Sequence, residues 1–193
     1  SDILHWKSNF REIYFDESET PVYSLHFGAN LISFPYLDCV PISDAIPDDI
    51  ESKITGIIGE GVAASPNEAL GWIGSLQCLE AYNGYWFKTD EDDEELVFQF
   101  TNNTSETLLS SGDRFKRDAR QKPKGYEYIQ SQYQAFYFLE DVTLDNQPLS
   151  EDDFIIAKMG NTVVGARKYF GQFTDVPVMG FDPDIRETVD YPK

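Results

Sequence analysis

Apolar and polar positions alternate along much of this chain, and helical spacing is rare. Residues 22–27 have period two, and similar runs follow in "LVFQF" at 96–100 and "YQAFYFLEDVTLDNQPL" at 133–149. Alternation over short runs bounded by glycine, proline and asparagine is typical of β-strands. We therefore expect a mainly β fold, made of two small β-sandwich-like modules joined by a polar linker.

Turn residues separate these runs. Residues 28–30, Gly-Ala-Asn, predict a tight turn or a bulge in which Asn30 has a structural role, because asparagine can bond its own backbone. Asp145-Asn146 and Gly160-Asn161 predict two further turns, the second of them in a hairpin.

Residues 42–58 are the exception to the strand pattern. Pro47 suits a first helical position, acidic residues follow it, and isoleucines recur every four residues from 46 to 54. The pattern predicts one short helix in the first module, ending at Gly56.

The chain divides into four predicted parts. Six of the fifteen basic residues lie between Arg114 and Lys124, in a polar stretch that separates the strand-rich regions. The parts are an N-terminal arm at 1–20 with strand character, a first β module at 21–101, a basic polar linker at 102–125, and a second β module at 126–193.

Acidic side chains outnumber basic ones, 34 to 15, which gives a formal net charge of −19. Such a surface repels nucleic acid and anionic membranes, so neither is an expected partner. Three explanations of this charge stay open: a solvated surface, bound divalent cations or a basic partner. No cofactor is certain, and Ca²⁺ is the one candidate. Its candidate ligands are Asp141, Asp145, Glu151, Asp152 and Asp153.

Cys39 and Cys78 are the only cysteines. With only two histidines to add, no spacing suits a zinc site. A disulfide between the two, as in a secreted protein, and a pair of buried thiols both stay open.

Two pairs of segments carry a family resemblance. "GANLISFPYL" at 28–37 and "GWIGSLQCLEAYNGYWFK" at 71–88 resemble modules of outline "NLISFP … GSL … GYW" in large secreted and surface proteins of marine and gliding bacteria. "QAFYFLEDVTLDNQPLSEDDFIIAKMGNTVVGARKYFG" at 134–171, with "TDVPVMGFD" at 174–182, resembles a companion β module of outline "QAFYF … VGAR … DVPVMG". The resemblance implies a β scaffold and brings no catalytic residues with it.

Modules similar to the second unit continue past a segment like the one at 188–191 into a further strand. The resemblance therefore implies that the second sheet lacks a final strand, and an unpaired sheet edge invites a partner. We expect the N-terminal arm of one copy to complete the sheet of the next, which would give an open fibre. The residues expected in this contact are Ile13, Tyr14, Phe15, Val189 and Tyr191.

No catalytic motif is recognisable. His5 lies in the expected arm and His26 in an expected strand, so neither is placed as a base, and "GIIGEG" at 56–61 lacks the Lys-Ser/Thr ending of a phosphate-binding loop. Aromatic residues offer a binding alternative, since they form either strand core or a flat platform for a sugar. The candidate platform residues are Trp72, Tyr82, Tyr85 and Trp86.

The sequence therefore predicts a non-catalytic, extracellular or cell-surface structural or adhesive protein that assembles head to tail into fibres. Two alternatives stay open: a calcium-assisted carbohydrate-binding module of a secreted polysaccharide-degrading system, and a fibre or decoration protein of a marine bacterial virus. The expected partners are further copies of the chain, a neighbouring surface protein or a glycan, without nucleic acid or membrane insertion.

Overall fold

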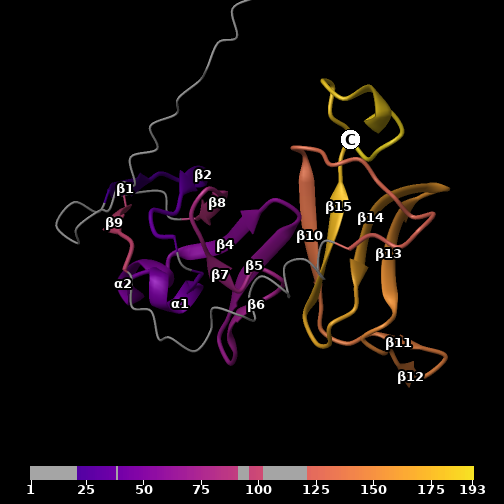
Figure 1. Ribbon diagram of the computed structural model, residues 1–193, viewed down its shortest axis with the longest axis horizontal. Helices are drawn as coiled ribbons and strands as arrows, with labels where there is room; N and C mark the ends of the chain where they lie inside the picture. Colours follow the sequence, from indigo (N-terminus) through magenta and orange to yellow (C-terminus); the bar gives the residue numbers. More distant parts are fainter. Residues whose placement is uncertain (1–20, 38, 91–95, 102–120) are drawn as a thin grey trace, which may run out of the picture.

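Strands make up most of the regular structure, and the helices are short (Figure 1). This computed structural model confirms the predicted mainly β, sandwich-like class. The predicted arm and most of the predicted linker lie outside the residues that it describes. The described residues are 21–37, 39–90, 96–101 and 121–193.

The elements follow the chain in the order in which Figure 1 labels them. In the first part they are β1 (Val22–Leu25), β2 (Gly28–Ser33), β3 (Val40–Pro41), α1 (Ile42–Ala45), α2 (Asp48–Glu51), β4 (Ile54–Gly59), β5 (Val62–Asn67), β6 (Gly71–Ile73), β7 (Cys78–Leu79), β8 (Gly84–Thr89) and β9 (Leu96–Gln99). In the second part they are β10 (Gln134–Leu139), β11 (Thr143–Leu144), β12 (Gln147–Pro148), β13 (Phe154–Met159), β14 (Thr162–Lys168), β15 (Thr174–Met179) and the 3₁₀-helix η2 (Arg186–Thr188).

A five-stranded antiparallel sheet of order β2-β8-β4-β5-β6 organises the first part. Successive side chains of a strand point to opposite faces of its sheet. Accordingly, Tyr85 and Phe87 of β8 are buried, whereas Trp86 between them is exposed. The alternation in the sequence therefore separates one core-facing side of this sheet from one outward-facing side.

Aromatic rings fill the core beneath the sheet. Phe100 contacts Tyr23, Phe34 and Phe98 edge to face, with ring centroids 5.0 Å apart in each pair. Edge-to-face pairs add stabilisation to that of the buried apolar area. The antiparallel pair β1-β9 is thereby attached to the sheet through side chains rather than through a shared ladder.

The short helix predicted within 42–58, starting at Pro47, is present as α2 but is only four residues long; a second four-residue helix, α1, precedes it and a strand follows it. Helix α1 ends at Ala45, and Pro47 precedes α2, because proline has no N–H to continue the first helix. The chain enters β4 at Ile54, where burial of a β-branched side chain in the sheet overrides the four-residue spacing. The expected helix end at Gly56 is therefore wrong.

Asn30 has the structural role predicted for it, although it lies inside a strand rather than in a turn. Strand β2 already begins at Gly28, and a bend at Phe27 separates it from β1. The buried Asn30 side chain accepts a hydrogen bond from the His26 N–H (2.9 Å) and donates one to the His26 carbonyl (2.8 Å). The Asn30 side chain thus provides hydrogen-bond partners for the backbone N–H and carbonyl of His26, which lies between β1 and β2.

The second part contains three antiparallel pairs, β10-β15, β13-β14 and the short pair β11-β12. Because each part has its own hydrophobic cluster, we call the two parts the first and second modules. The predicted turns at 145–146 and 160–161 are confirmed, since Leu144 pairs with Gln147 and Met159 with Thr162. Strands β14 and β15 lie so close that a Cβ at Gly165 would overlap the Pro177 carbonyl oxygen. Glycine is required there because no other residue leaves room for the neighbouring backbone.

The residues after β15 fold back on the second part. The Gly180 N–H donates to the Tyr133 carbonyl, and the Phe181 N–H donates to the Pro192 carbonyl, both at 2.6 Å. The Tyr191 ring is buried, and its hydroxyl accepts a hydrogen bond from the Ile129 N–H (2.8 Å). These contacts hold the 180–193 segment in the hydrophobic cluster of its own module.

The close approach of the two modules at Gly74 predicts a position-specific loss of stability. Gly74 has a φ of +111°, and a Cβ on it would lie 2.6 Å from Phe138 Cε1 and closer still to the Ala63 carbonyl oxygen. Gly171 has a nearly equal φ of +106° but open space around it.

We expect Gly171→Ala to lower the free energy of unfolding by about 1–2 kcal/mol through backbone strain alone. Gly74→Ala should cost at least about 2 kcal/mol more, because it adds a steric clash. Urea denaturation of both variants measures the difference, and equal losses would contradict the described contact between the modules.

Candidate functional site

A buried ion pair lies where the two modules meet. The side chains of Arg167 on β14 and Asp175 on β15 are 1% and 0% exposed, and Arg167 Nη2 lies 3.0 Å from Asp175 Oδ2. Arg167 Nε also donates to the Asp175 carbonyl oxygen at 2.6 Å. The guanidinium thus bonds both the side chain and the backbone of the facing strand.

The same pair bonds to the first module. The Ser75 hydroxyl donates to Asp175 Oδ2 at 2.8 Å, and Arg167 Nη2 donates to the Gly61 carbonyl oxygen at 2.8 Å. Gly61 lies between β4 and β5, and Ser75 follows β6. We call these four residues the junction cluster, because they tie segments about 100 positions apart in the sequence.

Burial has a cost for this cluster. Removal from water raises the pKa of Asp175 from 3.8 to about 6, although the Arg167 charge and the Ser75 hydrogen bond oppose the shift. Within the described part of the chain, Asp175 Oδ1 accepts no hydrogen bond. Because a buried ion pair often adds little net stability, its clearest effect is to select one arrangement of the modules.

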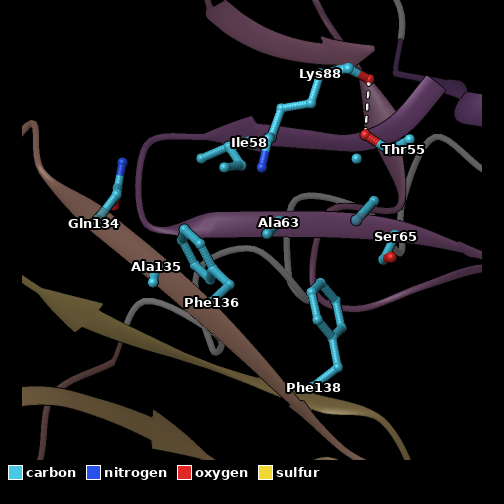
Figure 2. Close-up of a pocket in the computed structure, with 11 residues that line it drawn as sticks. Thr55, Ile58, Ala63, Ser65, Lys88, Gln134, Ala135, Phe136 and Phe138 are labelled. Carbon is cyan, nitrogen blue, oxygen red and sulfur yellow. Dashed lines mark hydrogen bonds between the residues drawn. The ribbon is translucent and has the colours of Figure 1, made fainter. Parts of the chain in front are cut away.

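An apolar contact also joins the two modules (Figure 2). Phe136 and Phe138 project from β10 toward β4 and β5, where they line a cleft of about 240 Å³ with Ile58 and Ala63. The Thr55 hydroxyl donates to the Lys88 carbonyl at the far wall (3.2 Å). The junction therefore combines a polar centre with an aromatic flank.

A second, more open hollow of about 320 Å³ crosses the same junction. Trp72 of β6 forms part of one wall, and Phe170 and Phe173 of the loop between β14 and β15 form the other. We call this hollow the junction groove. Its described lining residues are Leu70, Trp72, Ile73, Gly74, Gln77, Phe170, Gln172 and Phe173.

The structure does not bring the four predicted platform residues together. Trp72 lines the junction groove, but Tyr85 is in the core of the first module. Trp86 is 43% exposed on the opposite face of β8, and Tyr82 is 93% exposed in the turn before it. Alternation along the strand separates Tyr85 from Trp86, so these four cannot form one flat surface.

The predicted calcium ligands are likewise not assembled. Among the described residues, no three His, Cys, Asp or Glu side chains form a group that could hold a metal ion. Asp153 instead accepts hydrogen bonds from the Ser150 N–H (2.7 Å) and hydroxyl (2.9 Å), which lower the pKa of its carboxyl. The Asp152 carboxylate lies 4.0 Å from the Lys168 ammonium group.

The residues predicted for strand donation have different surroundings. Ile13, Tyr14 and Phe15 lie outside the described residues. Val189 is exposed, whereas Tyr191 is buried and hydrogen-bonded to Ile129. The predicted partner contact of Tyr191 is therefore replaced by a contact within its own module, because its ring closes the apolar cluster there.

The two cysteines form a disulfide, the first of the two alternatives left open by the sequence. Cys39 and Cys78 have Cα atoms 5.4 Å apart, and Cys78 pairs with Pro41 across β3 and β7. The bond closes a loop of 39 residues, which stabilises a fold by about 3–4 kcal/mol in the chain-entropy account. The bond anchors β7, which directly follows Gln77, a residue that lines the junction groove.

No helix in the described part of the chain is long and apolar enough to cross a membrane. Comparisons with protein-family models, with curated proteins and with solved structures found no match.

Sequence reasoning missed the junction cluster and the second wall of the groove. The available signal was a charged residue of each sign inside a strongly apolar run, Arg167 in "VVGARK" and Asp175 in "TDVPVM". Charges in such runs are buried only when they are paired. For Phe170 and Phe173 no local pattern marks a site, because their neighbours come from the other module.

The raised pKa of Asp175 predicts a specific pH dependence. Since the folded-state pKa lies above 3.8, the native protein binds more protons than the unfolded chain between about pH 4 and 6. The contribution of this carboxyl to the free energy of unfolding therefore falls as pH rises through that window. A shift of this size corresponds to about 3 kcal/mol.

Asp175→Asn removes the titration and keeps an oxygen acceptor for Arg167 and Ser75. We expect the stability advantage of the wild type over this variant to shrink by up to about 3 kcal/mol between pH 4 and 6.5, as measured by urea denaturation. Asp152→Asn, at a fully exposed side chain, serves as the control and should follow the wild-type curve. Parallel curves for the wild type and Asp175→Asn would show that Asp175 does not titrate in this range.

Proposed function

We propose that this protein is a non-catalytic, extracellular or cell-surface structural or adhesive protein, whose two β modules act as one rigid unit. The observation that carries the proposal is the junction cluster, in which Arg167 and Asp175 are almost wholly buried and bond to Ser75 and Gly61. Two modules joined only by a flexible tether would move independently. Buried hydrogen bonds across the junction instead suit a body that transmits force or sets a spacing between neighbours.

The disulfide supports the extracellular setting. Structural disulfides persist in oxidising compartments and are rare in the cytosol of mesophiles. The acidic surface, with a net charge of −19, favours solubility in a salty medium, where ions screen self-repulsion.

An outward-facing apolar row supports contact with neighbours. Leu31, Trp86 and Ile58 are paired in register across β2, β8 and β4, on the side of the five-stranded sheet away from the core. Leu31 and Trp86 are exposed, whereas Ile58 at the end of the row is half-buried and lines the cleft against β10. We call these three residues the outer row. Strand β2 is also an edge of its sheet, and exposed edges are sites of strand addition.

We expect the full chain to associate with itself at concentrations on the order of 10 µM. Sedimentation velocity across a concentration series, followed by electron microscopy of the concentrated protein, measures the stoichiometry and shows whether filaments form. Trp86→Lys and Leu31→Lys should weaken association by at least about tenfold, since each places a charge in the outer row.

Tyr137→Lys, an equally large change at an exposed position of β10, is the matched control and should associate normally. A chain that stays monomeric at roughly a hundred times the expected dissociation constant would rule out self-assembly through this surface.

A further inference from the structure

We propose that the junction groove is a binding site for a neutral polysaccharide, in which one or two sugar rings stack against Trp72 and the facing phenylalanines. This inference goes beyond the structural role proposed above and does not depend on self-association. It rests on the composition, charge, size and rigidity of the groove.

The aromatic side chains supply the stacking surfaces. Trp72, Phe170 and Phe173 are each half-buried, so their rings are held by the fold while part of each ring remains accessible. An aromatic face excludes water and attracts the polarised C–H groups of a sugar ring. Because the rings come from both modules, a ligand between them would contact two walls at once.

The polar side chains of the groove are uncharged amides. Gln77 and Gln172 are exposed, one on each module. An amide side chain both donates and accepts hydrogen bonds, as sugar hydroxyl groups do. None of the described residues that line the groove carries a charge, and the strongly acidic chain repels uronate or sulfate groups. A neutral hexose polymer fits this chemistry better than an acidic glycan.

The first wall is fixed by its neighbours. The Trp72 indole N–H donates to the Glu51 carboxylate of α2, and the ring packs against the core of the first module. Gln77 directly precedes Cys78 of the disulfide. Gly74 lies between Trp72 and Gln77 in the sequence and directly precedes Ser75, which bonds to Asp175 in the junction cluster.

The second wall is fixed by the buried Thr174. Its hydroxyl donates to the Gly171 carbonyl (2.7 Å) and accepts from the Phe170 N–H (3.2 Å), which closes the loop between β14 and β15. Phe173 has a φ of +59°, in the left-handed region that non-glycine residues rarely adopt. Such strain is common at binding sites, where the surrounding structure maintains it. A rigid groove loses little conformational entropy on binding.

The size is consistent with a short part of a polymer chain. A volume of about 320 Å³ is at the lower end for ligand sites, and the hollow is open rather than enclosed. An open groove gives a sugar unit of a polymer access from the solvent.

Binding is tested with the full chain and with defined probes, cellohexaose, laminarihexaose and mannohexaose, by titration calorimetry. Polygalacturonate is the acidic comparison. We expect at least one neutral hexasaccharide to bind with a dissociation constant on the order of 10–1000 µM and polygalacturonate not to bind. Because none of the described lining residues is a carboxylate, EDTA should leave the affinity unchanged.

Trp72→Ala should lower the affinity at least roughly tenfold, as loss of a buried aromatic anchor does. Gln77→Ala and Gln172→Ala remove exposed amides and should each lower it by about two- to tenfold. These two variants keep the test decisive if Trp72→Ala fails to fold. Tyr82→Ala removes an exposed ring outside the groove and should bind like the wild type.

Three results would overturn the proposal: no binding of any neutral probe, equal affinity of the wild type and the amide variants, or loss of binding in EDTA. If the groove instead binds a second copy of the chain, none of the sugars binds to the wild type. In that case Trp72→Ala and Gln77→Ala abolish self-association. If the outer-row variants do not alter self-association, the proposal of self-assembly through that row fails. The proposal of sugar binding is not affected by that result, so the two proposals can be rejected separately.

Discussion

The buried pair of Arg167 and Asp175 is the constraint on which the arrangement of the two modules depends. Desolvation of two opposite charges is costly, and the cost is offset only where each finds further hydrogen bonds. Here the further bonds come from Ser75 and from the Gly61 carbonyl, both in the first module. Docking therefore gives the buried charges of the second module two hydrogen bonds to the first, and the docked arrangement creates the junction groove.

The strand class and several local features follow directly from the sequence. Alternation identified the β fold, and the dipeptides Asp-Asn and Gly-Asn identified the turns at 145–146 and 160–161, because the left-handed backbone found at Asp145, Asn146 and Gly160 suits those residues. Asn30 was also interpreted correctly as a backbone brace. The helix start at Pro47 was also correct, but its end was not, since isoleucines spaced by four satisfy a helix face as well as a buried strand. Ile54 is instead buried as the first residue of β4.

Local sequence patterns could not predict the candidate site, for a different reason. Trp72 and Phe173 are about one hundred positions apart and meet only because two modules dock at one angle. Three of the four aromatic residues predicted as a platform, Tyr82, Tyr85 and Trp86, lie within a few positions of one another, where strand alternation sends adjacent side chains to opposite faces. Proximity in the sequence was thus evidence against a shared surface, while a charge of each sign in two apolar strands indicated where the modules are joined.

The Cys39–Cys78 bond has a consequence for where such a groove can operate. The bond closes the segment that carries Gln77 and lies a few residues from Trp72, so it braces the same wall that would contact a ligand. Thiol-rich surroundings that open this cross-link would loosen that wall, and the same segment carries Ser75, which bonds to Asp175 at the junction. Ligand capture and module docking would then both weaken as the medium becomes reducing.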